Sequence, residues 1–294
     1  MKGLDISSYQ NGINFDAIKN AGINFLILRA GFTGWGTGVN YNKDNCFENF
    51  YNQAKQYGIP VGAYWYSCAN NYEKGVAEAK FMYENCLKGK QFEFPIYIDV
   101  EDTHHQVNNK RGVTDAIIGF CETLENLGYY VGIYASDISG FKDKMNLNEL
   151  NAYDKWVARY GSKPKYVKQY GMWQSTSTGR INGYNENLDT DESYKDYSSI
   201  IKNGGFNGFS KQSNDRVIQQ PTHVETITND FKVGDNVKII KTGNGSSYGT
   251  SNTAYGIGWN RTILNIYPER SYPYQVGNAS GTTGFYKKDA LEKI

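Results

Sequence analysis

The stretch that decides the fold is Pro95-Ile-Tyr-Ile-Asp-Val-Glu-Asp102, where apolar residues lead directly into acidic side chains. On a β-strand, residues two apart point to the same face. Asp99 and Glu101 would then lie side by side, with Cα atoms roughly 6–7 Å apart. A continuous apolar run is typical of a strand covered on both faces. The stretch therefore predicts a buried strand that ends in a pair of carboxylates.

Comparable runs occur throughout the first 200 residues, and helical apolar spacing separates the early ones. The expected strands are 4–7, 25–31, 60–67, 95–101, 130–135, 155–160, 171–175 and 181–189. Strand–helix units followed by closely spaced strands predict an α/β fold, an irregular (β/α)5(β)3 TIM-like barrel over residues 1–202. In such barrels the chemistry lies at the carboxyl ends of the strands.

Polar residues and glycines predict where the helices begin and end. Asn14 and Thr114 suit helix starts, where side-chain oxygens accept backbone N–H groups. Gly22, Gly58 and Gly128 suit the left-handed position that ends many helices.

The pattern changes after residue 202. Residues 203–229 are rich in Gly, Ser, Asn and Gln and show no periodicity, which predicts a linker. Short β-type runs punctuated by Gly and Asn resume in residues 230–294. They predict a small all-β barrel as a second domain.

Polar side chains also close other strands of the predicted barrel. Asp5 ends the first strand, Tyr64 and Tyr66 end the third, and Asp189 lies near the last. Several carboxylates on one rim are costly unless a site requires them. Close like charges resist joint ionisation, so one carboxyl keeps its proton. A protonated carboxyl beside an ionised one is what glycosidic cleavage requires.

These residues carry a resemblance to a known family. Asp5-Ile-Ser-Ser-Tyr-Gln10 resembles the D-x-S-x-x-Q opening of the glycoside hydrolase family 25 lysozymes. Further motifs follow in that family's order: Arg29-Ala-Gly31, Gly62-Ala-Tyr-Trp-Tyr-Ser67, Ile98-Asp-Val-Glu101, Gly132-Ile-Tyr-Ala-Ser136, Trp156-Val-Ala-Arg-Tyr160 and Trp173-Gln174. The resemblance covers residues 1 to about 200. It implies a (β/α)5(β)3 barrel with N-acetylmuramidase activity on bacterial peptidoglycan.

The resemblance also implies residue roles. Glu101 would be the general acid/base, and Asp99 would stabilise positive charge or orient the N-acetyl group of the substrate. Asp5 and Asp189 match the other two family carboxylates. The family's V-D-x-N ending reads Leu188-Asp-Thr-Asp191 here, so the motif favours Asp189 over Asp191. The residues expected to line the sugar cleft are Arg29, Tyr64, Tyr66, Tyr134, Trp156 and Gln174.

The composition limits the classes of partner and cofactor that we expect. The net charge of +1 does not favour nucleic acid, and no run approaches the ~20 apolar residues of a membrane span.

No cofactor or metal is expected, because adjacent His104 and His105 project in divergent directions and no H-E-x-x-H occurs. The four cysteines form no C-x-x-C and are expected to be reduced and buried. Met1-Lys2-Gly3 runs directly into a strand-like segment, so no signal peptide is expected. We therefore expect synthesis in a host cytoplasm and action on the wall after release.

The C-terminal residues carry a second resemblance. Val233-Gly-Asp-Asn-Val-Lys238 resembles the opening of bacterial Src-homology-3-like wall-binding domains, and Tyr272-Pro-Tyr-Gln-Val276 resembles a later strand. This implies that the domain tethers the chain to a cell-wall polymer, as in phage endolysins. A homo-oligomer formed through this domain is an alternative expectation. About half of its aromatic residues should fill the core. The candidate wall contacts are Trp259, Tyr272, Tyr274 and Tyr286.

Two alternatives differ in function. A chitinase-like glycosidase would carry a D-x-x-D-x-D-x-E strand, which Tyr97-Ile-Asp99 does not provide. A non-catalytic wall-binding protein would not need the intact pair of Asp99 and Glu101.

Overall fold

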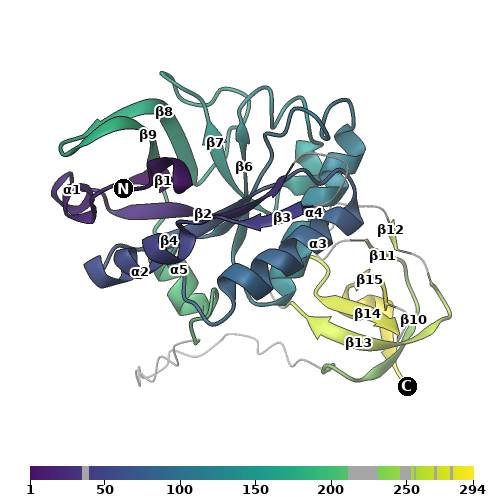
Figure 1. The fold of residues 1–294 in the computed structure, drawn as a ribbon. Helices are drawn as coiled ribbons and strands as arrows, with labels where there is room; N and C mark the ends of the chain where they lie inside the picture. Colours follow the sequence, from purple (N-terminus) through teal and green to yellow (C-terminus); the bar gives the residue numbers. More distant parts are fainter. Residues whose placement is uncertain (35–39, 211–230, 246–252, 255, 268–269, 279–280) are drawn as a thin grey trace, which may run out of the picture. The chain divides into compact units, whose positions relative to one another are not determined.

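The computed structural model describes residues 1–34, 40–210, 231–245, 253–254, 256–267, 270–278 and 281–294. The chain divides into two compact units, Met1–Asn214 and Asp215–Ile294. Each unit has its own sheet and its own hydrophobic core, and Figure 1 labels their elements.

The first unit is a closed barrel of eight strands. They are β1 (Lys2–Ile6), β2 (Phe25–Gly34), β4 (Val61–Tyr66), β5 (Ile96–Asp99), β6 (Val131–Ser136), β7 (Asp154–Ala158), β8 (Met172–Ile181) and β9 (Tyr184–Ser193). Neighbouring strands from β1 to β8 are parallel, and β9 is antiparallel to both β8 and β1, where the barrel closes. The predicted eight-stranded barrel is confirmed.

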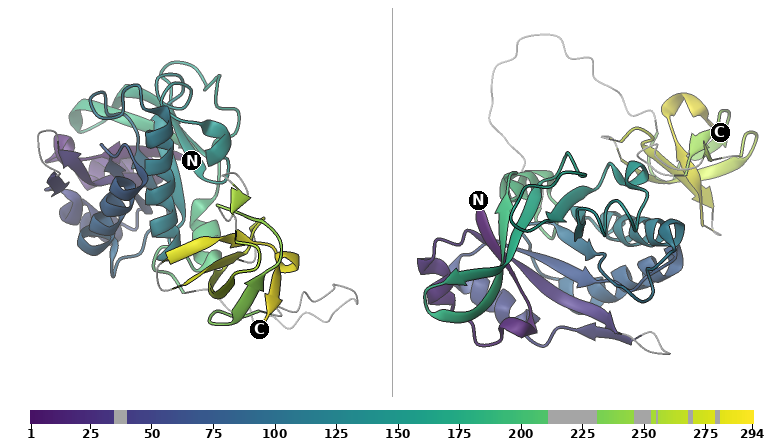
Figure 2. Two further views of the ribbon diagram at one scale, coloured as in Figure 1. Left: turned by 90° about the vertical axis from the view of Figure 1, so that its right-hand side faces the viewer. Right: turned by 90° about the horizontal axis from the view of Figure 1, so that it is seen from above.

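Two features at the edges of the barrel were not predicted. Strand β3 (Asn40–Lys43) folds back antiparallel on the long end of β2. The β8–β9 hairpin curves away from the barrel at the upper left of Figure 1, and Figure 2 shows it from two further directions. Both features extend the sheet of the barrel beyond the apolar runs. Their outer ends are polar, so the apolar pattern could not reveal them.

Helices follow the early strands. They are α1 (Phe15–Asn20), α2 (Phe47–Tyr57), α3 (Tyr72–Met82, continued by a π turn at Tyr83–Leu87) and α4 (Lys110–Asn126). The expected fifth helix is reduced to a 3-10 turn at Leu147–Leu150. Across the described ranges, none of the helices combines the length and apolar character needed to cross a membrane.

The predicted helix ends are partly correct. Asn14 caps α1, and Gly58 ends α2 in the left-handed conformation with φ of 68°. Helix α4, however, starts at Lys110 behind the capping Asn109, four residues before the predicted Thr114. The Thr114 hydroxyl instead donates to the carbonyl of Lys110 at 2.7 Å, as threonines inside helices do.

Helices α3 and α4 pack closely side by side (Figure 1). A Cβ atom on Gly75 would lie 2.0 Å from the carbonyl oxygen of Ala116, and one on Gly119 would lie 2.4 Å from that of Tyr72. Real Cβ atoms do not come this close, so the two glycines allow the helix backbones to touch. This contact holds α3 in place beside the barrel mouth.

Helix α5 (Tyr197–Gly204) closes the amino-terminal end of the barrel. Its Tyr197 and Ile201 are fully buried in one cluster with Phe25 and Phe94, which lie at the starts of β2 and β5. The Phe25 and Phe94 rings stack with their centroids 4.3 Å apart. Aromatic packing thus seals this end and leaves the carboxyl ends of the strands as the open mouth.

The polar Asn207 anchors the segment after α5. Its Nδ2 donates to the carbonyls of Phe92 at 3.1 Å and Phe94 at 2.9 Å, and its Oδ1 accepts the N–H of Tyr130 at 2.8 Å. The side chain is fully buried. The chain is therefore attached to the barrel through hydrogen bonds rather than through an apolar repeat.

Because of this attachment, the expected linker cannot begin at residue 203. Residues 203–209 pack on the barrel, although the linker was predicted to begin at residue 203. No apolar periodicity could reveal them, because Asn207 carries the attachment. Residues 211–229 of the expected linker lie outside the described part of the chain.

The second unit is an antiparallel sheet with the strand order β12-β11-β15-β14-β13-β10-β16. Its strands are β10 (Asn236–Ile239), β11 (Gly243–Asn244), β12 (Thr253–Ala254), β13 (Asn260–Ile266), β14 (Tyr274–Asn278), β15 (Gly281–Tyr286) and β16 (Leu291–Lys293). Tyr274 and Tyr286 belong to its core and are 4% and 0% exposed, so their prediction as wall contacts is wrong. Trp259 is 51% exposed, and Tyr272 is half-buried.

Candidate active site

Strand register arranges functional side chains around the barrel mouth. The successive Cα partners across β4, β5, β6 and β7 are Tyr66, Asp99, Tyr134 and Trp156. Asp5 of β1 is likewise the partner of Asp189 of β9. Paired residues on neighbouring strands share a face of the sheet. Hydrogen bonding of the backbone alone therefore brings distant parts of the sequence to one mouth.

Asp99 and Glu101 form a coupled acidic pair at the end of β5. Asp99 is 3% exposed and Glu101 is half-buried. Burial, and next the charge of Glu101, raise the pKa of Asp99 well above its usual value. Burial also raises the pKa of Glu101, with Lys144 opposing the rise and Asp189 adding to it. Removal from water is thus the larger cause for both, ahead of the expected like-charge repulsion.

Gln174 links the two sides of the mouth. Its Nε2 donates to Asp5 Oδ2 at 2.8 Å, and its Oε1 accepts the hydroxyls of Tyr134 at 2.8 Å and Tyr160 at 3.1 Å. Burial, and next the charge of Asp191, raise the pKa of Asp5 well above its usual value. The amide therefore holds Asp5 in place against its acidic neighbours.

Asp191 takes the position of the asparagine in the expected V-D-x-N motif. It is fully buried, and its Oδ1 accepts the indole N–H of Trp156 at 2.8 Å. Burial raises its pKa to about 8, and burial raises the pKa of Asp189 to about 6. Asp189 lines the cleft, whereas Asp191 does not. The predicted choice of Asp189 thus agrees with the geometry, but a further acid lies next to it.

Arg29 is held by a partner that the sequence did not reveal. Its Nε lies 2.8 Å from Oδ2 of the buried Asp44, and its Nη2 donates to Ser8 Oγ at 2.9 Å. The guanidinium also lies over the rings of Tyr9 and Phe32, at 4.9 and 5.3 Å from their centroids. Asp44 directly follows β3, 15 residues after Arg29, so no motif near Arg29 could predict this contact.

A cleft of about 460 Å³ is lined by every residue predicted for the catalytic site and the sugar cleft. The predicted residues that line it are Asp5, Arg29, Tyr64, Tyr66, Asp99, Glu101, Tyr134, Trp156, Gln174 and Asp189. The further lining residues are Ser7, Tyr9, Gln10, Phe32, Thr33, Gly34 and Tyr160. Tyr9 is 81% exposed and Tyr160 is 54% exposed, whereas Trp156 and Tyr134 are buried. Exposed rim aromatics are therefore better placed than Trp156 to stack on a ligand.

Glu78 supports the mouth from helix α3. This buried carboxyl accepts the hydroxyls of Thr33 at 2.6 Å and Ser67 at 2.5 Å and the N–H of Cys68 at 3.1 Å. Burial raises its pKa to about 7. Because Thr33 belongs to β2 and Ser67 follows β4, one side chain ties two strand ends together.

The other candidates lie outside this cleft. His104 and His105 follow β5, and their N–H groups donate to the buried Asp102. All four cysteines are buried and free of disulfides, as predicted. A second cleft of about 600 Å³ lies at the starts of β7 and β8, but Asp154 is its only acidic lining residue. It lacks the pair of carboxylates that glycosidic cleavage requires.

Comparison with known proteins decides the family. The family model described as glycosyl hydrolases family 25 matches residues 4–184. The chain belongs to glycosyl hydrolase family 25. An autolytic lysozyme of Clostridium acetobutylicum is 31% identical over 193 residues, which cover 65% of this chain and 55% of that enzyme. The chain thus matches about half the length of this relative.

Solved structures support the same assignment. The CTP1L endolysin is 25% identical with a TM-score of 0.58, covering 68% of this chain and 69% of that chain. A family 25 glycosyl hydrolase from Bacillus anthracis is 25% identical with a TM-score of 0.55, covering 68% of this chain and 91% of that chain. In both comparisons the similar part is about the length of the barrel unit of this family 25 chain.

Replacement of Asp191 tests the buried acid of this family 25 barrel. Its pKa is raised from 3.8 to about 8, so between these pH values the folded chain holds a proton that the unfolded chain has lost. The free energy of unfolding therefore falls as pH rises through this window. Asp191→Asn keeps an oxygen for Trp156 and should be more stable than the wild type by on the order of 5 kcal/mol at pH 8, because each pKa unit corresponds to about 1.4 kcal/mol, with the gain vanishing near pH 4.

Urea denaturation from pH 4 to pH 9 measures this effect. Glu186→Gln, on the exposed part of β9, is the matched control and should follow the wild type at every pH. A wild-type protein that is as stable as Asp191→Asn at pH 9 would contradict the buried-acid assignment.

Proposed function

We propose that the barrel hydrolyses the β-1,4 bond between N-acetylmuramic acid and N-acetylglucosamine in bacterial peptidoglycan. The observation that carries the proposal is that Asp99 and Glu101 enter one cleft with raised pKa values. Such cleavage needs one carboxyl that donates a proton to the leaving oxygen and a second that assists from nearby. The Clostridium relative, an autolytic lysozyme, supports this substrate class.

The burial of the pair suggests how the two roles divide. Glu101 is the more open of the two and is proposed as the general acid/base. Asp99 is deeper, and within the described residues its Oδ1 accepts no hydrogen bond. That oxygen suits the N–H of the substrate's acetamido group. We propose that Asp99 orients this group, while Asp5 and Asp189 add negative potential that favours a positively charged transition state.

Removal of the acid should abolish lysis. Glu101→Gln keeps the shape of the side chain but cannot donate a proton with similar strength, so wall clearing should fall by about 10²–10⁴-fold. Asp99→Asn should also lower the rate strongly. The control Glu84→Gln lies on an exposed helical turn and should retain full activity.

Two readouts test this proposal. Turbidity of purified cell walls gives the rate, and mass spectrometry of the soluble fragments identifies the bond that is cut. Muramic acid at the reducing end supports the muramidase assignment, whereas reducing glucosamine would refute it. Equal clearing by wild type and Glu101→Gln would remove Glu101 from the mechanism.

The pH–rate profile should move in opposite directions in two variants. The general acid must be protonated, so activity falls as pH rises through its raised pKa. Asp189 raises the pKa of Glu101, and Lys144 lowers it. Asp189→Asn should therefore shift the alkaline limb to lower pH, and Lys144→Met should shift it to higher pH. Shifts in the same direction, or none, would show that these charges do not act on the catalytic acid.

We also propose that the second unit is an Src-homology-3-like module that holds the enzyme on a cell-wall polymer. Trp259 is 51% exposed, and the Arg261 guanidinium lies 4.5 Å from its ring centroid. Lys287 lies 5.2 Å from the Tyr272 ring. Exposed and half-buried rings beside cations suit a polymer with sugar faces and anionic groups. Tethering would raise the local concentration of the barrel at its substrate.

Binding to purified walls tests the second unit. The full chain carrying Glu101→Gln leaves the walls intact, and adding Trp259→Ala to it should weaken sedimentation with walls about tenfold. Ile240→Ala, which removes a side chain that is 42% exposed from the same unit, is the control. Walls stripped of secondary polymers by acid distinguish glycan from polymer binding. Unchanged sedimentation of the Trp259 variant would exclude that ring as a contact.

A further inference from the structure

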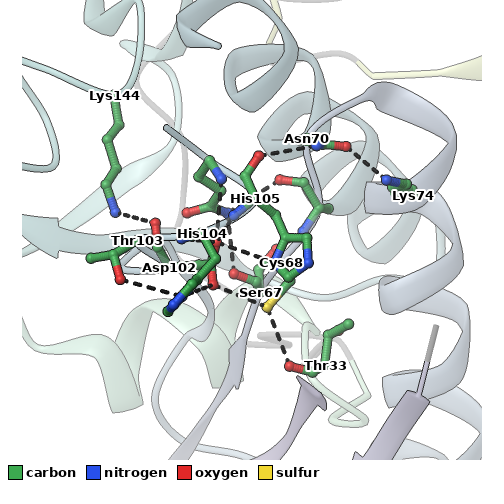
Figure 3. A network of polar contacts seen from close by, with 12 residues as sticks. Thr33, Ser67, Cys68, Asn70, Lys74, Asp102, Thr103, His104, His105 and Lys144 are labelled. Carbon is green, nitrogen blue, oxygen red and sulfur yellow. Dashed lines mark hydrogen bonds and ion pairs between the residues drawn. The ribbon is translucent and has the colours of Figure 1, made fainter. Parts of the chain in front are cut away.

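A separate cluster of metal-ligating side chains lies beside the catalytic strand. Cys68 follows β4, and Asp102 and His105 follow β5; one ligand atom from each lies within 4.8 Å of the others. Cys68 and Asp102 are buried, and His105 is half-buried. Figure 3 shows the three side chains converging, and none of them lines the catalytic cleft.

The distances within this cluster suit a tetrahedral ion. Cys68 Sγ lies 3.5 Å from Asp102 Oδ1, and His105 Nδ1 lies 3.4 Å from Asp102 Oδ2. Zinc binds sulfur at ~2.3 Å and nitrogen or oxygen at ~2.0–2.2 Å, so its tetrahedral ligands are about 3.4–3.6 Å apart. These two distances go to different oxygens of Asp102, and the three donor atoms all lie within 4.8 Å of one another, so side-chain shifts of about 1 Å would bring them onto one ion.

Two buried atoms near Cys68 lack a hydrogen-bond partner among the described residues. They are Nδ1 of His105 and Oε1 of Gln106. Gln106 is 2% exposed, and its Nε2 donates to the carbonyls of Ser67 and Ala69, on either side of Cys68. A buried polar atom without a partner is costly. Both atoms can offer a lone pair, which is what a cation or its bound water would satisfy.

The loop also prepares Asp102 for coordination. Its Oδ2 accepts the N–H groups of His104, His105 and Gln106, which fixes the carboxylate in the loop (Figure 3). Hydrogen bonds of this kind orient metal ligands and strengthen their binding. The carboxylate therefore needs little reorganisation to bind an ion.

We propose that Cys68, Asp102 and His105 bind a zinc ion, with water in the fourth position. A thiolate, an imidazole and a carboxylate together suit zinc, whereas magnesium and calcium prefer oxygen ligands alone. On binding, the S–H bond of Cys68 breaks, the Zn–S bond forms and the proton passes to solvent. The affinity therefore rises with pH. The ion would join the end of β4 to the loop after Glu101, and this inference does not depend on the proposed reaction.

Titration of the metal-free full-length chain with zinc and cobalt tests the site. Calorimetry should show one ion per chain, and the cobalt complex should show a sulfur-to-metal charge-transfer band. Cys68→Ser should lose this band, and both Cys68→Ser and His105→Gln should weaken binding at least tenfold. The controls His104→Gln and Cys46→Ser should keep both the affinity and the band.

The change in Tm on adding zinc measures binding in variants that fold less stably than the wild type. Zinc should raise the Tm of the wild type and of His104→Gln, because a ligand that binds only the folded state stabilises it. At the same zinc concentration it should raise the Tm of His105→Gln by less, and this half-exposed side chain can be replaced without opening the core. Absence of stoichiometric binding to the wild type, or a band that survives in Cys68→Ser, would overturn the proposal.

Discussion

Burial of several carboxylates at one barrel mouth is the constraint on which the rest of the structure depends. Asp5, Asp99 and Asp191 are each 7% exposed or less, and burial is the largest cause of the raised pKa of each. Ionised carboxyls in such surroundings are expensive unless they are paired or hydrogen-bonded. The barrel provides neutral donors instead of cations: Gln174 for Asp5 and Trp156 for Asp191. Neutral donors hold these two acids in place without adding a compensating positive charge.

The remainder of the barrel holds the strand ends of this mouth in place. At the opposite end, Tyr197 and Ile201 of α5 seal the interior with aromatic and aliphatic side chains. At the side, Gly75 and Gly119 let α3 and α4 touch, and α3 carries Glu78 to the ends of β2 and β4. These contacts are remote from the acidic pair. They nevertheless fix the strand ends whose register decides which carboxyls meet.

Much of this arrangement could be predicted, because it follows from patterns that are local in sequence. Buried parallel strands are continuous apolar runs, and the two acids after Ile98 follow such a run directly. What could not be predicted depends on single polar contacts between distant residues. Asp44 holds Arg29 across a hairpin, and Asn207 fastens a segment that looks like a linker. The small second domain was ambiguous for another reason: Tyr274 and Tyr286 have the same residue type as surface contacts, and only packing shows that they fill its core.

The position of Asp191 shows how one acidic residue changes the demands on its neighbours. Register places Asp5 opposite Asp189 and Gln174 opposite Asp191, so β9 brings two carboxyls to a mouth where the family motif expects one. An asparagine at residue 191 could accept the Trp156 N–H without any charge. The aspartate makes the same contact but can lose a proton near pH 8, and its charge then acts directly on Asp5. The electrostatics of the mouth therefore depend on pH across the barrel from the acidic pair, which couples the stability of the barrel to the protonation of its site.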